Sequence, residues 1–266
     1  MTEGAQLKAG CAAAYESEFA RVLLGGSLHP GGTALTARLG ELLDLRPGQR
    51  VLDVAAGSGE SAIFIAKRFG CEMCGVDFGA DQVATASQRA AAADVAGRVR
   101  FERGDAEQLP FTAESFDAAV CECAFCTFPD KRTAAREFAR VLKSGGRLGL
   151  SDLTRSGPLP PELEGLLAWI SCIADARPVS EYVCYLEEAG FTAVSVESHD
   201  QALAQMVREI QGKLLSAELM VKLKKLELPG ADFEQAKRLA RAAAEAVRCG
   251  LLGYSLLTAT APLRVS

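Results

Sequence analysis

The feature that most constrains the fold is the alternation of short apolar segments with helical segments through the middle of the chain. The first apolar segment, RVLDVA at 50–55, leads directly into a glycine turn. Compact apolar segments alternating with helices indicate strands buried on both faces. The sequence therefore predicts a doubly wound, mostly parallel α/β sheet with helices on both faces. The predicted strands are 50–55, 72–76, 99–102, 116–121 and 147–151, and the predicted helices are 61–69, 81–96 and 132–142.

The segments on either side of this alternation are mainly helical. The helix at 132–142 should stop at Gly145 and Gly146, because glycine is common just past a helix end. A helix with Ser180 as its N-cap should end at Gly190. Helices within 201–248 are interpreted as an insertion before the last strand. The remaining predicted elements are helices at 12–24, 33–43 and 162–174 and strands at 191–197 and 253–261.

Composition and charge narrow the class of protein. The 266 residues suffice for one large α/β domain, and 49% hydrophobic residues indicate a globular chain. The net charge of −5 argues against a nucleic-acid partner bound through a broad basic face. No apolar run approaches the ~20 residues that span a bilayer, and the N-terminus lacks signal-peptide features, so we expect a cytoplasmic chain and no membrane. In that compartment the nine cysteines should stay reduced rather than form disulfides.

A glycine turn and two acidic residues indicate a nucleoside ligand. Gly57 and Gly59 bracket the turn after the first strand, where amide groups at a helix N-terminus can face a ligand. A tight turn without any ligand is the alternative for this motif alone. Asp77 ends the second strand, where an acid can accept hydrogen bonds from ribose hydroxyls of a nucleoside or a nicotinamide dinucleotide. Asp105, after the third strand, stands at the sheet edge where an adenine amino group could be recognised.

Together these segments resemble the class I S-adenosylmethionine-dependent methyltransferases in order and spacing over about 100 residues. The resemblance implies a Rossmann-like sheet of seven strands with a final antiparallel hairpin, which matches the late strand at 253–261. It disfavours a nicotinamide-dependent oxidoreductase. The segments that carry it are VLDVAAGSGE (51–60), GVDFGADQV (75–83), GDAEQLPF (104–111), SFDAAVCECAF (115–125) and REFARVLKSGGRLGLSDL (136–153).

The resemblance also implies where S-adenosyl-L-methionine would bind. Gly57 and Gly59 would face its methionine part, Asp77 would hold the ribose, and Asp105 and Ala106 would lie by the adenine. The sequence departs from many relatives at Ala56, which is small enough to leave the turn open. The full set of predicted cofactor-binding residues is Asp53, Ala55, Gly57, Ser58, Gly59, Asp77, Phe78, Gly104, Asp105, Ala106 and Cys121.

The implied domain organisation has three parts. Residues 1–48 form N-terminal helices or a lid, and 49–155 form the cofactor-binding core. Residues 156–266 supply substrate-side helices, the helical insertion and the last strands of the same sheet. A homodimer is left open.

Two cysteines suggest a particular acceptor. Cys123 precedes Pro-Asp-Lys in CAFCTFPDK (123–131), and Cys172 lies in WISCIADA (169–176); both segments resemble those of arsenite methyltransferases. The resemblance implies that Cys123 and Cys172 are metalloid ligands and catalytic residues, because soft thiolates suit trivalent arsenic. A third cysteine of some relatives is missing, since Glu60, Ser61 and Ala62 follow the glycine turn. The alternatives are another soft-atom acceptor, or two thiols that only pack.

The other chemistry-bearing residues leave the acceptor open. Cys71 and Cys74 could pair with Cys123 and Cys126 in a zinc site. Geometry argues against it, because Cys71 should open the second strand at the amino edge of the sheet, whereas Cys126 lies past the carboxyl edge of the fourth. His29 could be a general base, a lid contact or a turn residue, and Tyr15 could reach the substrate or pack in the core. The sequence thus predicts a methyltransferase of a small acceptor, with arsenite as one candidate. The alternatives are an organic carbon, oxygen or nitrogen acceptor, or a protein that binds the cofactor without transferring methyl.

Overall fold

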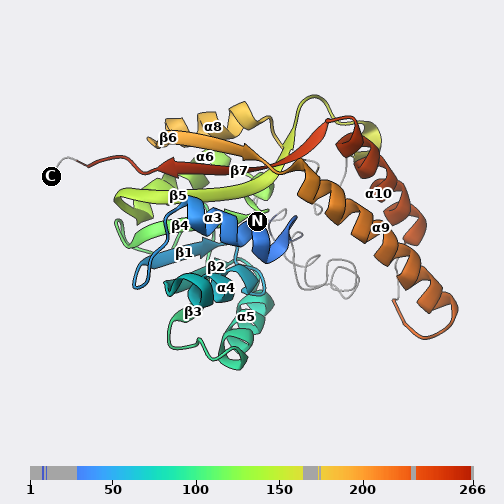
Figure 1. Ribbon diagram of the computed structural model, residues 1–266, viewed down its shortest axis with the longest axis horizontal. Coiled ribbons are helices and arrows are strands. Elements are labelled where there is room, and N and C mark those ends of the chain that lie inside the picture. Colours follow the sequence, from blue (N-terminus) through green and yellow to red (C-terminus); the bar gives the residue numbers. More distant parts are fainter. Residues whose placement is uncertain are drawn as a thin grey trace.

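The computed structural model contains one seven-stranded sheet in the order β3-β2-β1-β4-β5-β7-β6 (Figure 1). It describes Lys8, Gly10, Ile173 and residues 29–163, 175–228 and 232–264. Strands β1 to β5 are parallel, and β7 is antiparallel to both β5 and β6. The predicted mostly parallel seven-stranded sheet with an antiparallel end is confirmed. The strands are β1 Arg50–Val54, β2 Glu72–Asp77, β3 Val99–Arg103, β4 Phe116–Glu122, β5 Leu142–Arg155, β6 Thr192–Ser198 and β7 Leu252–Thr260.

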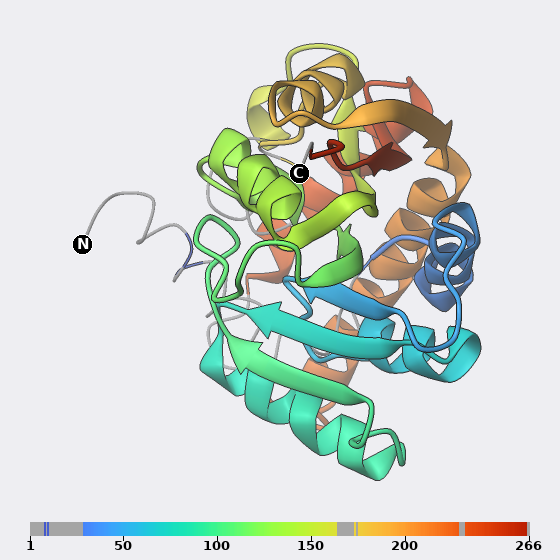
Figure 2. The same ribbon diagram turned by 90° about the vertical axis from the view of Figure 1, so that its left-hand side faces the viewer.

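Helices cover both faces of the sheet. Figure 2 shows α6 on one side of the sheet and α3 and α4 on the other. Four of the five residues of β1 are buried, as expected for a central strand that is covered on both faces. The helices are α3 Gly32–Leu42, α4 Glu60–Phe69, α5 Ala80–Ala92, α6 Lys131–Val141, α8 Val179–Glu188, α9 Asp200–Lys222 and α10 Phe233–Arg248, with 3-10 turns at Phe125–Thr127 and Pro161–Leu163.

Two predicted boundaries are wrong. Helix α6 passes directly into β5 at Leu142, so Gly145 and Gly146 lie inside a strand and do not stop the helix. Pairing with β4 explains this, because Leu142 pairs with Phe116 before the register shifts. Helix α8 begins at Val179 after Pro178, so Ser180 is not its N-cap. The predicted helix at 12–24 and most of the one at 162–174 lie outside the described residues.

Helices α9 and α10 form a pair between β6 and β7 that extends away from the sheet (Figure 1). Near the sheet, Leu203 and Ala246 belong to the main hydrophobic core. Farther out, Leu214 packs with Ala236 and Ala240 in a separate small cluster. Both helices stand between β6 and the last strand, β7. Within the described residues, none of the helices combines the length and apolar character needed to cross a membrane.

Candidate active site

A cavity with about 930 Å³ of empty space, part of it open solvent, lies where β1, β2, β3 and β4 end. Ligands of open α/β sheets bind at this carboxyl edge. The residues that line the cavity follow each of these strands, and one comes from the N-terminal segment. They are Lys8, Val54, Ala55, Gly57, Val76, Asp77, Phe78, Gln82, Gly104, Asp105, Ala106, Glu122, Cys123, Ala124, Thr127 and Phe128.

Asp77 organises the glycine turn at the floor of this cavity. Its two carboxylate oxygens accept hydrogen bonds from the amides of Gly57 and Gly79, each at 2.8 Å. Burial raises the pKa of Asp77, and these amide donors counteract part of that rise. Gly59 has φ 80°, and a Cβ there would lie 2.6 Å from the Phe101 ring, so only glycine suits this position. The conformation of the turn is therefore fixed by Asp77 at the end of β2 and by the close packing of Phe101 against Gly59.

Lys8 closes one end of the cavity against the segment after β3. Its Nζ lies 2.9 and 2.8 Å from the two carboxylate oxygens of Asp105 and 2.6 Å from Glu107 Oε2. Phe78 and Ala106 line the same part of the cavity. The ammonium of Lys8 thus forms ion pairs with the carboxylates of Asp105 and Glu107.

Two buried acids, Asp53 and Glu122, line a smaller cavity beside the glycine turn. Asp53 is 2% exposed, and its Oδ2 has no hydrogen-bond partner among the described residues. Burial, reinforced by the negative charges of Glu122 and Asp77, raises the pKa of Asp53 well above its usual range. Glu122 accepts hydrogen bonds from Ser61 Oγ at 2.6 Å and Thr36 Oγ1 at 3.1 Å. Since a buried charge needs a partner, these acids suit a ligand with positive charge.

His29 lies beside these acids. It is buried, and its Nε2 lies 3.7 Å from Glu122 Oε2. It lines the same smaller cavity, which has about 370 Å³ of empty space, together with Asp53, Ser58 and Glu122. Because Ala55, Gly57 and Glu122 line both cavities, the two spaces are neighbours around the glycine turn.

The cysteines fall into different environments. Cys123 is half-buried and lines the main cavity. Cys121 is fully buried in β4, where burial raises the pKa of its thiol well above the usual range. Cys126 is also fully buried, and its amide donates to Asp152 Oδ2 at 2.8 Å. Cys172 lies outside the described residues. Across the part of the chain that the structure describes, no group of three or more His, Cys, Asp or Glu residues could hold a metal ion.

Most of the predicted site residues meet at these cavities. The main cavity is lined by Ala55, Gly57, Asp77, Phe78, Gly104, Asp105, Ala106 and Cys123, and the smaller one adds Asp53 and Ser58. Gly59 and Cys121 are not among the lining residues of either cavity. The cofactor contacts of all the predicted residues stay predictions.

Sequence reasoning missed eight residues that line the main cavity. Glu122 could have been found, because it is the last residue of the fourth strand and therefore lies at the ligand-binding edge. Lys8 carries no comparable signal, since it is far from the core in sequence. The missed residues are Lys8, Val54, Val76, Gln82, Glu122, Ala124, Thr127 and Phe128.

Comparisons with known proteins agree with this geometry. Residues 51–146 match the family described as a methyltransferase domain. The 27-O-demethylrifamycin SV methyltransferase of Amycolatopsis mediterranei is 35% identical over 250 residues, which cover 89% of this chain and 86% of the relative. An arsenite methyltransferase of Halobacterium salinarum is 30% identical over 59% of this chain and 41% of its own length.

A solved structure shares the fold. The Haemonchus contortus phosphoethanolamine N-methyltransferase 2 in complex with S-adenosyl-L-methionine has a TM-score of 0.81 and 17% identity, over 96% of this chain and 60% of that one. The sequence relatives, the sheet order and the cavity at the carboxyl edge lead to one family. The chain belongs to the class I S-adenosylmethionine-dependent methyltransferases, enzymes that take the methyl group from S-adenosylmethionine.

Proposed function

We propose that this enzyme methylates a hydroxyl group of a small, uncharged organic molecule. The observation that carries the proposal is the wall that follows β4, where Cys123, Ala124, Thr127 and Phe128 line the cavity. None of these side chains carries a positive charge that could bind a phosphorylated or carboxylated acceptor. Lys8, the basic residue among the described lining residues, is occupied by Asp105 and Glu107. The relative named as a 27-O-demethylrifamycin SV methyltransferase supports an oxygen acceptor.

The buried acids of the site fit the cofactor. S-adenosylmethionine has a positively charged sulfonium and an ammonium group, and the buried carboxyl groups of Asp53 and Glu122 offer oxygen acceptors for them, with Asp53 Oδ2 unpartnered among the described residues. In this proposal Asp77 holds the ribose hydroxyls, and Asp105 and Ala106 lie by the adenine. When bound, the cofactor would supply an electrophilic methyl group, whose bond to the sulfonium sulfur breaks as the acceptor oxygen bonds to the carbon. The protein's main contribution is then to hold the acceptor oxygen in line with that group.

The wall also favours an acidic hydroxyl. The described residues of the wall beyond Glu122 offer no carboxylate, imidazole or amine that could take a proton from an alcohol. A phenolic hydroxyl, with a pKa of about 10 as in tyrosine, ionises far more readily than an alcohol and so needs less help from the protein. We therefore propose a phenol or an enol as the acceptor.

A methyl-transfer assay tests the proposal. Purified protein and cofactor with a labelled methyl group would be incubated with catechol, 27-O-demethylrifamycin SV, phosphoethanolamine, or arsenite plus glutathione. We expect label in ether products of the hydroxyl compounds and none in phosphoethanolamine. Transfer to phosphoethanolamine, with none to the hydroxyl compounds, would show that the uncharged wall does not select the acceptor.

Arsenite is the second candidate, because the Cys123 thiol lines the cavity. In this reading Cys123 and Cys172 together bind the metalloid. Cys123→Ser and Cys172→Ser should each abolish arsenite methylation and leave cofactor affinity nearly unchanged. Cys184→Ser, at an exposed position on α8, is the matched control. Arsenite methylation that persists in both variants would show that these two thiols do not bind the metalloid, and no transfer to arsenite by the unaltered protein would remove this candidate.

A further inference from the structure

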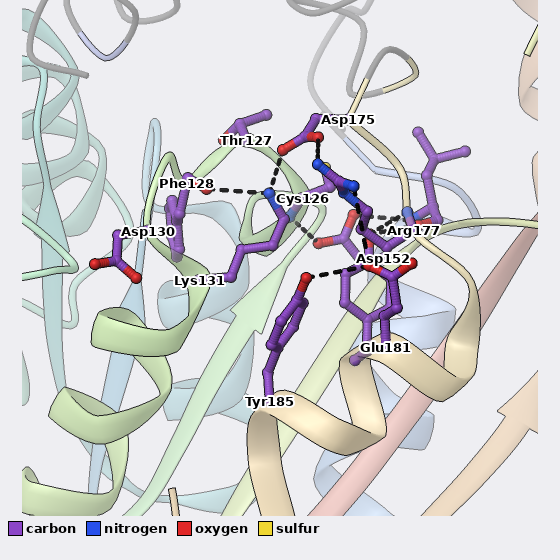
Figure 3. Close-up of polar contacts among 12 residues, drawn as sticks. Cys126, Thr127, Phe128, Asp130, Lys131, Asp152, Asp175, Arg177, Glu181 and Tyr185 are labelled. Atoms are coloured by element: carbon purple, nitrogen blue, oxygen red, sulfur yellow. Dashed lines mark hydrogen bonds and ion pairs between the residues drawn. The ribbon is translucent and has the colours of Figure 1, made fainter. Parts of the chain in front are cut away.

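A buried lysine lies directly behind the cavity wall. Lys131, the first residue of α6, is 6% exposed and is not among the residues that line the cavity. Its Nζ donates to the carbonyl oxygen of Phe128 at 3.0 Å and forms an ion pair with Asp175 (Figure 3). Lysine is almost never buried without a partner, so the position of this side chain depends on Asp175.

Asp175 belongs to a short segment that hydrogen bonds attach to β5 and α8. It also pairs with Arg177, and the carbonyl of Arg177 accepts a hydrogen bond from the Arg155 amide at 3.2 Å at the end of β5. The Arg177 amide donates to Tyr182 Oη at 3.1 Å, within α8. Residues 175–177 therefore connect β5, α8 and Lys131.

Several contacts fasten the loop in front of Lys131, including a hydrogen bond from the Asp130 amide to Glu107 Oε1 at 2.8 Å. Near its middle, the Cys126 amide donates to the buried carboxylate of Asp152. At its end, the Phe128 carbonyl accepts from Lys131. Thr127 lies between these two contacts, and both Thr127 and Phe128 line the cavity. Lys131 thus fixes the backbone that carries the wall without reaching the ligand space itself.

We propose that Lys131 and Asp175 form a clasp that positions the cavity wall at Thr127 and Phe128 and so sets the affinity for the methyl acceptor. Lys131 is a positioning residue in this proposal. Removing one partner of a buried ion pair leaves the other charge uncompensated, and the local structure must then rearrange. The inference rests on the proposed function, because it takes Thr127 and Phe128 as acceptor contacts. The proposed cofactor residues Asp53, Gly57 and Asp77 lie on other strands and loops, so cofactor binding should be spared.

The experiment compares Lys131→Met with Asp175→Asn, the double variant and the conservative Lys131→Arg in the full chain. Lys143→Met is the control, since its ion pair with Asp117 is partly exposed and lies away from the cavity. With catechol as the acceptor, we expect Lys131→Met to raise KM about fivefold or more with kcat changed less than about twofold. The affinity for S-adenosylhomocysteine should stay within about twofold. Lys131→Arg should restore most of the loss in KM.

Amide hydrogen exchange tests the clasp without any acceptor. We expect exchange in 126–128 and 175–177 to accelerate about tenfold or more in Lys131→Met and to be unchanged in Lys143→Met. If no hydroxyl compound is methylated, the proposed function is wrong. The exchange measurement still tests the clasp, because it does not depend on activity. Unchanged exchange, or an S-adenosylhomocysteine affinity that falls as much as KM rises, would overturn the inference. If Lys131→Met does not fold, Asp175→Asn and the double variant give the same readouts.

Discussion

At the scale of single residues, Asp77 shows how one side chain can serve both the fold and the ligand. Its oxygens accept hydrogen bonds from the amides of Gly57 and Gly79, so the carboxylate shapes the turn before any ligand binds. Each carboxylate oxygen can accept more than one hydrogen bond, which leaves capacity for ribose hydroxyls. The proposed binding role and the observed structural role are therefore compatible.

We expect Asp77→Ala to weaken cofactor binding by about 2–3 kcal/mol, because it removes a buried acceptor and leaves donors unpaired. Isothermal titration with S-adenosylmethionine measures the change. Asp81→Ala, an exposed acid on α5, is the control for general charge effects. An unchanged affinity in Asp77→Ala would mean that the ribose is held elsewhere.

Asp53 should make the stability of the cofactor-free protein depend on pH. Burial raises its pKa well above the unfolded value of about 3.9, so at higher pH the folded state binds more protons than the unfolded state. The contribution of Asp53 to stability therefore falls as the pH rises from about 4 toward the folded pKa.

Asp53→Asn removes this titration. The melting temperature of the variant minus that of the wild type should therefore increase as the pH rises from 4 to 7. One kcal/mol corresponds to about 2–4 °C in a domain of this size. Melting curves at several pH values, with the exposed Asp81→Asn as control, provide the measurement. A constant difference between Asp53→Asn and the wild type across this range would contradict the assignment.

At the scale of elements, the pair α9 and α10 is held at its two ends by different contacts. The near end joins the main core through Leu203 and Ala246. There the Asp200 carboxylate also accepts a hydrogen bond from the Tyr254 amide at 2.9 Å. The far end depends on a small cluster around Leu214. Separate clusters of this kind open separately, so local and global stability should differ along the pair.

We expect Leu203→Ala to lower the free energy of unfolding by about 2–5 kcal/mol, as for other buried leucines. Leu214→Ala, with an equally buried side chain, should mainly speed hydrogen exchange in the far halves of α9 and α10. Denaturant unfolding and amide exchange on the two variants make a matched comparison. Equal losses of global stability would show that the pair unfolds as one unit with the sheet.

At the scale of the whole molecule, β7 completes the sheet from the far end of the sequence. It pairs with β5 from Arg147 to Arg155 and separates β5 from β6. It is buried over most of its length, and Tyr254 Oη donates to Ser151 Oγ at 2.9 Å. Without β7, both β5 and β6 would present unpaired edges, which promote aggregation.

A chain that ends at Arg248 should therefore lose its native circular dichroism and become insoluble when expressed. A chain that ends at Arg264 keeps β7 and serves as the control. Solubility and thermal melting compare the two. A soluble, cooperatively melting protein without β7 would show that β1 to β5 suffice for folding.

How much the sequence predicts depends on how local the signal is. The strands β1 to β4 and the helices between them were predicted to within a few residues, because apolar spacing and glycine turns act over short stretches of chain. The prediction that Gly145 and Gly146 stop a helix is wrong because it used only this local signal. The local pattern indicates a helix end, whereas pairing between Leu142 and Phe116 makes the segment a strand.

The sequence by itself determined the fold class, the glycine turn and most of the acids and small residues at the carboxyl edge. Tertiary structure decided which polar groups that are distant in sequence become partners. Lys8 meets Asp105, His29 meets Glu122, and Lys131 meets Asp175 across long stretches of chain. No periodicity encodes such pairs, because charges separated in sequence become partners only when burial brings them together and makes an unpaired charge costly.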